Sequence, residues 1–390
     1  MSVTLEAPVM TAERPIPRPK PSFYQPELDT LRFLAFLGVF FFHALPRTAD
    51  GYQAAGRLAP WIAATVGSGA FGVDLFFGLS AYLITTLLLR EKESRGALDV
   101  KAFYIRRILR IWPLYFGFVL FALGLTWIGF RSQSLTAPYV VGYTLLAGNW
   151  VYVAYGLPQS VTVPLWSISI EEQFYLLWPA VVRKSSRRAM VWIALSLLLI
   201  SQAVRVLSWL WMNPATPQFT MEYNTFVRMD PIPLGILFAL LLDGKIPDLS
   251  TRKRSALFII GATTWIIVGR YSSFDVTAPF QFFYNVVGRP AIALASIAIL
   301  AGVLGVRGLF THPLFVYLGK ISYGLYVLHE FALLVATKTI GPLAGPFTDV
   351  AVTAGGLLIT VALAAVSYRF VESPFLALKS RFTYVSSRSV

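Results

Sequence analysis

Residues 29–46 read DTLRFLAFLGVFFFHALP, an almost wholly apolar stretch that contains an arginine, Arg32, and a histidine, His43. On an α-helix, a spacing of eleven residues is about 20° more than three full turns, so both side chains lie on one helix face, about 16 Å apart along the axis. An ionisable side chain in a membrane-length segment is energetically unfavourable and marks a functional site by default. The stretch therefore predicts a membrane helix that contributes to a reaction centre.

The composition extends this environment to the whole chain. Of the 390 residues, 56% are hydrophobic and only 13% are charged, whereas soluble domains carry about 25% charged residues. Long apolar runs recur along the sequence, which predicts an all-α, polytopic membrane protein. The first 22 residues are polar and lack the apolar core of a secretory signal. The absence of cysteine excludes disulfides, thiolate metal sites and a cysteine nucleophile.

The positive charge is concentrated in three segments between apolar runs. A net charge of +14 could suit a nucleic acid, but this distribution follows the positive-inside rule and favours a lipid bilayer as the partner. The connections 213–225, 271–281 and 341–348 contain no lysine or arginine and are predicted to face outward. The basic segments contain Arg90, Lys92, Arg95, Lys101, Arg106, Arg107 and Arg110; Arg183, Lys184, Arg187 and Arg188; and Lys245, Arg252, Lys253 and Arg254.

About ten transmembrane helices follow from this pattern. An even number places both termini on one side, and the basic segments make that side the cytoplasm of a multi-pass protein in the cell (inner) membrane. Residues 138–154 are also apolar, but an eleventh span would move residues 183–188 outside, so a re-entrant or interfacial element on the outer side is predicted. The predicted spans are 30–46, 70–89, 111–130, 165–182, 189–212, 226–243, 255–270, 282–306, 315–340 and 349–371.

The spans belong to one membrane-embedded domain, residues 23–376. The proline-rich segment 1–22 is predicted to be a disordered cytoplasmic tail, and 377–390 a second cytoplasmic tail.

The three histidines differ in their settings. No two of them have the spacing of helical metal ligands and no HExxH motif is present, so no metal site is predicted. His312 precedes a proline and is interpreted as a solvated loop residue. His329 shares a helix face with Ser322 and Tyr326, which fits either an interhelical hydrogen-bond cluster or substrate contact. Taken without Arg32, His43 could simply extend its polar ring toward the outer membrane interface. Because Arg32 lies on the same helix face, a role of His43 as a base is favoured instead.

Two further groups of charged residues lie at or within spans. Arg107 and Arg110 are one turn apart at the start of a span, where with Arg106 they suit either phosphate binding or positive-inside anchoring. Glu171 and Glu172 are adjacent, so on a helix they point about 100° apart and cannot share a proton. We expect one of them to pair with an arginine, Arg32 or Arg228, and the other to face a polar cavity. Asp74 precedes the small residues Gly78, Ser80 and Ala81, which allow close helix approach.

Six motifs follow one another along the chain: LDTLRFLAFLGVFFFHA, FFGLSAYLIT, RRILRIWPLY, WSISIEEQFYLLWP, ISYGLYVLH and YRFVESP. Together they resemble the acyltransferase-3 family of polytopic membrane enzymes, which transfer acyl groups from coenzyme A to hydroxyls of carbohydrates and related molecules. The first motif resembles the family's arginine, ten residues, then histidine; the third resembles its Arg-x-x-Arg element with the following proline and tyrosine. Ala81 and Tyr82 replace the usual glycine and phenylalanine, which affects packing rather than chemistry. The resemblance covers about residues 26–376.

The resemblance implies a membrane O-acyltransferase with no bound cofactor, whose donor is acyl-CoA, with acetyl the expected acyl group. The acceptor is a hydroxyl of a carbohydrate or glycoconjugate. His43 is the candidate general base, and a transient acyl-histidine is an alternative route. The catalytic candidates are His43, Arg32, Glu171 and Glu172; the substrate-binding candidates are Arg106, Arg107, Arg110, Ser167, Tyr326 and His329.

Two matters stay open at this point. His43 lies about 20 Å into its span, beyond the midplane of a core about 30 Å thick, whereas the coenzyme is cytoplasmic. The donor must therefore thread a channel between helices, or the first helix begins deeper in the membrane. A transporter or flippase for a lipid-linked saccharide would also explain charges within the membrane, but not the ordered motifs.

The C-terminal SGNH-type domain of some family members is not expected here, which implies transfer within one domain.

Overall fold

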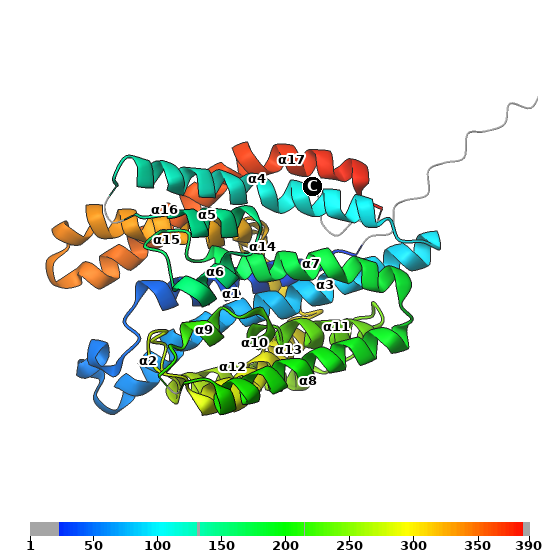
Figure 1. Cartoon of the computed structure of the whole chain (residues 1–390), viewed down its shortest axis with the longest axis horizontal. Helices are drawn as coiled ribbons and strands as arrows, with labels where there is room; N and C mark the ends of the chain where they lie inside the picture. Colours follow the sequence, from blue (N-terminus) through cyan, green and yellow to red (C-terminus); the bar gives the residue numbers. More distant parts are fainter. Residues whose placement is uncertain (1–22, 131–132, 214, 385–390) are drawn as a thin grey trace, which may run out of the picture.

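The computed structural model describes residues 23–130, 133–213 and 215–384, and the regular structure of these ranges is helical apart from two isolated β-bridges (Figure 1). The predicted tail 1–22 lies outside the described residues. The longer helices are α1 (Pro26–Ala44), α3 (Gly72–Arg95), α4 (Val100–Trp127), α7 (Leu165–Lys184), α8 (Arg187–Trp211), α11 (Pro231–Leu242), α12 (Thr251–Arg270), α13 (Arg289–Val303), α15 (Ser322–Thr339) and α16 (Thr348–Ser367).

Shorter helical segments connect the longer ones. The short α-helices are α2 (Ala59–Ser68), α5 (Ala137–Thr144), α6 (Gly148–Tyr155), α9 (Phe219–Glu222), α10 (Thr225–Arg228), α14 (Pro313–Lys320) and α17 (Ser373–Lys379). The 3₁₀ segments are η1 (Ala49–Leu58), η2 (Gly69–Phe71), η4 (Gly308–Thr311), η5 (Gly341–Leu343), η6 (Gly345–Phe347) and η8 (Ser380–Phe382), and η3 (Tyr284–Gly288) and η7 (Tyr368–Glu372) are π-helical.

Each of the ten predicted ranges overlaps one of these longer helices, but fewer of the helices qualify as membrane spans by length and composition. Within the described ranges five do, or six when α14 and α15 are taken as one broken span. Helix α1 carries Glu27, Asp29 and Arg32 within 19 residues, and α11 has only 12 residues. Ten spans and cytoplasmic termini therefore stay predictions, whereas the all-helical fold with several membrane-length helices is confirmed.

Two segments differ in detail from a simple row of spans. The predicted span 315–340 is not a continuous helix, because the chain bends by 72° between α14 and α15; the range is one broken span or a re-entrant element. The bend follows Gly319, a residue of low helix propensity. Residues 138–154 form the two eight-residue helices α5 and α6. Each is about 12 Å long, too short to cross a membrane alone.

Helix α1 lies in the middle of the bundle. Figure 1 shows α1, α3 and α7 between a group formed by α4, α15, α16 and α17 and a group formed by α8, α11, α12 and α13. The apolar side chains of α1, among them Phe36, Val39 and Phe40, are buried at the centre of this arrangement. This central position explains how one helix can contribute groups to two different sites.

Close backbone contacts hold α3 against its neighbours. A Cβ atom on Gly72 would lie 2.4 Å from the carbonyl oxygen of Ala35 in α1, and one on Gly235 would lie 2.3 Å from the carbonyl oxygen of Gly78. Both distances are far below van der Waals contact, so only glycine fits at these two positions. The prediction that small residues on α3 allow close helix approach is confirmed.

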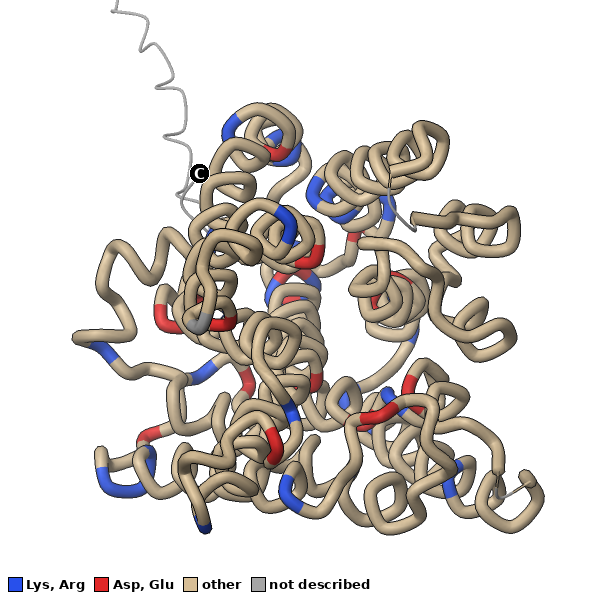
Figure 2. The backbone as a smooth tube through the Cα atoms, turned by 90° about the vertical axis from the view of Figure 1, so that its left-hand side faces the viewer, with Lys and Arg blue, Asp and Glu red and all other residues tan. Residues whose placement is uncertain are grey.

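Buried ion pairs connect α3 to the short helices α9 and α10 and to α13. Arg228 Nη2 lies 3.2 Å from Asp74 Oδ2, and Arg228 Nη1 lies 3.4 Å from Glu222 Oε1. Glu222 also pairs with Arg289, and Arg205 pairs with Asp230. Figure 2, which looks along the bundle, shows charged residues inside the ring of helices. The expectation that Arg228 could pair with Glu171 or Glu172 is wrong, because Asp74 and Glu222 take both of its Nη groups.

Candidate active site

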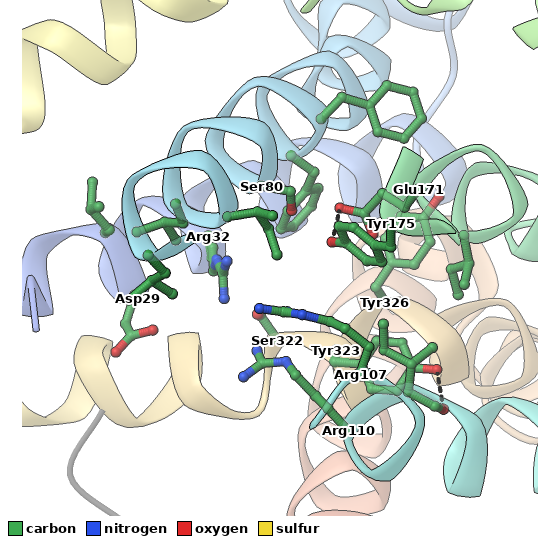
Figure 3. A pocket seen from close by; sticks show the side chains of 18 of the residues that line it. Asp29, Arg32, Ser80, Arg107, Arg110, Glu171, Tyr175, Ser322, Tyr323 and Tyr326 are labelled. Carbon is green, nitrogen blue, oxygen red and sulfur yellow. Dashed lines mark hydrogen bonds between the residues drawn. The ribbon is translucent and has the colours of Figure 1, made fainter. Parts of the chain in front are cut away.

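One end of α1 borders a small cavity rich in arginine, which we call the arginine cavity. Its volume is about 130 Å³, and α1, α3, α4, α7, α15 and α17 contribute to its wall. The guanidinium groups of Arg32, Arg107 and Arg110 converge across it (Figure 3). Four basic side chains line the cavity, these three and Lys379, against two acidic ones, Asp29 and Glu171. This balance favours an anionic ligand.

Arg107 is held by aromatic rings rather than by a carboxylate. Its Cζ lies 5.2 Å from the ring centroid of Tyr175 and 5.3 Å from that of Phe103. Its Nε is buried and has no hydrogen-bond partner among the described residues. A guanidinium positioned over aromatic faces keeps its planar set of donors available for a phosphate or carbonyl.

The two adjacent glutamates point to different surroundings, as their spacing predicts. Glu171 faces the arginine cavity and accepts a hydrogen bond from the Tyr175 hydroxyl at 3.1 Å. Glu172 lies outside the lining of that cavity and accepts a hydrogen bond from the Trp112 indole at 3.3 Å. Only Glu171 therefore shares a cavity with the arginine cluster.

Arg106 is not part of this cluster. Its Nη2 lies 2.8 Å from Glu91 Oε2, and its Nη1 donates to the Phe382 carbonyl at 2.7 Å. These contacts connect the start of α4 to the end of α3 and to η8. The structure thus brings together two of the three neighbouring arginines and directs the third to the C-terminal segment.

The other end of α1 borders a larger cavity, which we call the histidine cavity. Its volume is about 790 Å³. Its described wall includes three basic side chains, Arg47, Arg228 and Arg270, and three acidic ones, Glu222, Asp275 and Glu330. Aromatic rings make up much of the rest, including those of Phe42, Phe71, Trp166, Tyr223, Phe274 and Tyr284. The charges balance, in contrast to the arginine cavity.

His43 faces the histidine cavity and is paired with a carboxylate. Its Nδ1 lies 2.6 Å from Glu330 Oε1, and both side chains are about a quarter exposed. Sequence reasoning missed Glu330, although an acidic residue next to a histidine within an apolar span is itself a signal. The pair has the geometry of a base held by an orienting acid.

The remaining candidates lie between the two cavities. Tyr326 lines both, and Ser167 lines the arginine cavity with its hydroxyl 2.7 Å from that of Tyr326. His329 is fully buried behind His43, with ring centroids 5.1 Å apart, and its Nδ1–H donates to the Tyr326 carbonyl at 2.6 Å. The interhelical hydrogen bond on this helix face is therefore that of Tyr326 with Ser167 of α7, whereas the bond of His329 lies within α15.

His43, His329 and Glu330 also bring three potential metal-ligand atoms within 4.8 Å of one another. Ligands of a tetrahedral zinc ion are about 3.4 Å apart, since each lies at about 2.0–2.1 Å from the metal. The 2.6 Å contact of His43 with Glu330 is instead a hydrogen-bond distance. The arrangement fits a hydrogen-bonded pair better than a metal centre.

Comparison with known proteins identifies the class. A family profile described as an acyltransferase domain, acyltransferase-3, matches residues 25–369. The chain therefore belongs to the acyltransferase-3 family, as its motifs predict.

Curated relatives give a more particular likeness. The peptidoglycan O-acetyltransferase OatA of Listeria monocytogenes is 26% identical over 373 residues, which cover 90% of this chain and 56% of that protein. The O-acetyltransferase OatA of Staphylococcus aureus is 27% identical over 366 residues, which cover 90% of this chain and 57% of that protein. The chain thus spans just over half the length of these relatives. No solved structure matches it significantly.

Proposed function

We propose that the protein is a membrane O-acyltransferase that moves an acyl group, acetyl in the first instance, from acyl-CoA to a hydroxyl of a carbohydrate or glycoconjugate. The observation that carries the proposal is the pairing of His43 Nδ1 with Glu330 Oε1 at 2.6 Å on the wall of the histidine cavity. A carboxylate bonded to Nδ1–H fixes the tautomer whose Nε2 can accept a proton, and it stabilises the imidazolium that forms.

The arginine cavity is the proposed donor site. Coenzyme A is anionic through its phosphates, and guanidinium groups bind phosphate and carbonyl oxygens with two parallel hydrogen bonds. Arg107 and Arg110, with Arg32, present such groups to one space. The cavity lies at the starts of α1 and α4, the end of the bundle that the basic segments assign to the cytoplasm.

The histidine cavity is the proposed acceptor site. Its balanced charge suits an uncharged polar molecule, and its aromatic faces suit the apolar faces of sugar rings. It is lined by residues 269, 270 and 272–276, which include part of a connection predicted to face outward. The names of the relatives agree with a glycan acceptor.

The reaction then uses one proton twice. His43 Nε2 removes the proton from the acceptor hydroxyl as its oxygen bonds to the thioester carbonyl carbon. The carbon–sulfur bond breaks, the leaving sulfur takes the proton from the imidazolium, and the acceptor keeps the new ester. Glu330 acts through His43 by holding the ring and balancing its charge. Glu171, Ser167 and Tyr326 line the path between the donor and the base.

Turnover of labelled acetyl-CoA by the protein in membranes tests this function. The His43→Ala variant is expected to lose about 10²–10⁴-fold in rate. His312→Asn is the matched control, because His312 lines neither cavity and asparagine retains its helix-capping role. Transport of a saccharide without thioester cleavage, or full turnover by His43→Ala, would contradict the proposal.

A further inference from the structure

The two cavities meet at one place. Among the described residues, only Val73 and Tyr326 line both of them. Trp166 lines the histidine cavity, and the next residue, Ser167, lines the arginine cavity. The wall between the cavities therefore runs through Val73 of α3, Tyr326 of α15 and the first turn of α7.

Hydrogen bonds close this wall. The hydroxyls of Tyr326 and Ser167 are 2.7 Å apart, and they lie 3.2 and 3.1 Å from the Pro164 carbonyl, which can accept from either. Two hydroxyl protons thus serve two bonds, one between the hydroxyls and one to the carbonyl, so the set is complete without water. The Phe76 ring packs against Tyr326 with centroids 5.9 Å apart. Tyr326 and Ser167 are both buried.

The same wall is close to the base. Tyr326 and Glu330 are four residues apart on α15, so they share a helix face and are about 6 Å apart along the axis. An acyl group that passes Tyr326 is therefore only about one helical turn of α15, or about 6 Å, from the His43–Glu330 pair. The bond from His329 Nδ1–H to the Tyr326 carbonyl fixes the backbone at this point.

We propose that the Tyr326–Ser167 contact, with Val73, is the constriction through which the acyl end of the donor reaches His43, and that it restricts the donor to short acyl groups. The proposal rests on the proposed transfer from acyl-CoA. The Tyr326–Ser167 contact is closed, with hydroxyls 2.7 Å apart, so an acyl group must displace the Tyr326 ring to pass it. The displacement needed grows with the length of the chain and is smallest for a two-carbon acyl group.

The absence of native cysteine makes the wall directly measurable. We would place single cysteines in the arginine cavity (Ser80→Cys) and in the histidine cavity (Val163→Cys), in sealed vesicles treated with a membrane-impermeant maleimide. From the side that labels Val163→Cys, we expect no labelling of Ser80→Cys while Tyr326 is present, and labelling once Tyr326→Ala is added. Tyr326→Phe, which breaks the hydroxyl contact, should also permit that labelling. Tyr139→Phe, which loses a buried hydroxyl in α5 that lines neither cavity, should not.

Donor choice is the second readout. The ratio of kcat/KM for hexanoyl-CoA to that for acetyl-CoA is expected to rise about tenfold or more in Tyr326→Ala, and to a lesser extent in Val73→Ala. Labelling of Ser80→Cys from the acceptor side while Tyr326 is present would overturn the proposal, as would an unchanged donor ratio in both cavity-opening variants. Absence of acetyl-CoA turnover in the wild type would reject the proposed function instead, and the labelling would still decide whether Tyr326 separates the cavities.

Discussion

Replacing Glu330 by glutamine removes the negative charge next to His43 while keeping the shape of the side chain at position 330. The pair is close, at 2.6 Å, and its side chains are only 27% and 26% exposed, so solvent screens it partly. Hydrogen bonds to charged groups contribute about 1.5–3 kcal/mol, and about 1.36 kcal/mol corresponds to a tenfold change in rate. We therefore expect Glu330→Gln to lower kcat for acetyl transfer roughly 10- to 150-fold.

The assay is steady-state acetyl transfer by purified variants in lipid nanodiscs, with kcat and KM for acetyl-CoA measured separately. KM should change little, because Glu330 lies outside the lining of the arginine cavity. Glu93→Gln, an exposed acid near the end of α3, is the matched control. In a His43→Ala background the Glu330→Gln change should cost no more than about twofold, since residues that act as a unit are not additive. An equal loss in both backgrounds, or an unchanged kcat, would refute the role of Glu330.

Three other predictions concern the donor side of the molecule. Arg107→Gln should raise KM for acetyl-CoA about tenfold or more. Arg106→Gln should leave this KM within about twofold and lower the melting temperature, because Glu91 loses its partner. Equal KM values for the two variants would contradict this prediction. Lys379→Gln should raise KM for acetyl-CoA about two- to fivefold and leave KM for the acceptor unchanged, as expected for a partly solvated cation. The Ala102 N–H and the Tyr384 hydroxyl donate to Asp99 and lower the pKa of its carboxyl. Its stabilising effect is therefore present above the unfolded-state pKa near 3.9 and is lost as pH falls through the lower folded value. The melting-temperature difference between wild type and Asp99→Ala should shrink below about pH 4. A difference that does not change with pH would argue against a stabilising role of the ionised Asp99 carboxylate at the start of α4.

Helical periodicity predicted part of the geometry of the candidate site. Arg32 and His43 lie on one helix, and their separation along its axis places them in different cavities at its two ends. The spacing of Arg107 and Arg110 within one turn likewise brings both to the arginine cavity, and the 100° between Glu171 and Glu172 directs only Glu171 there. These placements depend on local geometry, which a sequence contains.

Other features depend on packing between distant segments. Lys379 reaches the arginine cavity because α17 packs along α4, and no sequence pattern near residue 379 predicts this contact. Arg106, unlike Arg107 and Arg110, points away from the arginine cavity because it binds Glu91 and the Phe382 carbonyl, two residues that are far apart in the sequence. The bend after Gly319 depends on the approach of α14 to α1, where a Cβ at 319 would lie 1.9 Å from the Asp29 carbonyl oxygen. Such tertiary contacts bend a range whose apolar periodicity alone predicts one continuous helix.

The buried ion pairs have a consequence for biogenesis. Arg289 at the start of α13 pairs with Glu222, which also pairs with Arg228, the partner of Asp74 on α3. A lone charged side chain in a membrane helix opposes insertion, by about 2.5–3.5 kcal/mol at the helix centre and less toward its ends. Asp74 is synthesised long before its partners, whereas Arg289 emerges when all of its partners are already in the membrane. We expect the first half of the bundle to stay loosely assembled until α13 is inserted, and chains that end before residue 289 to be degraded.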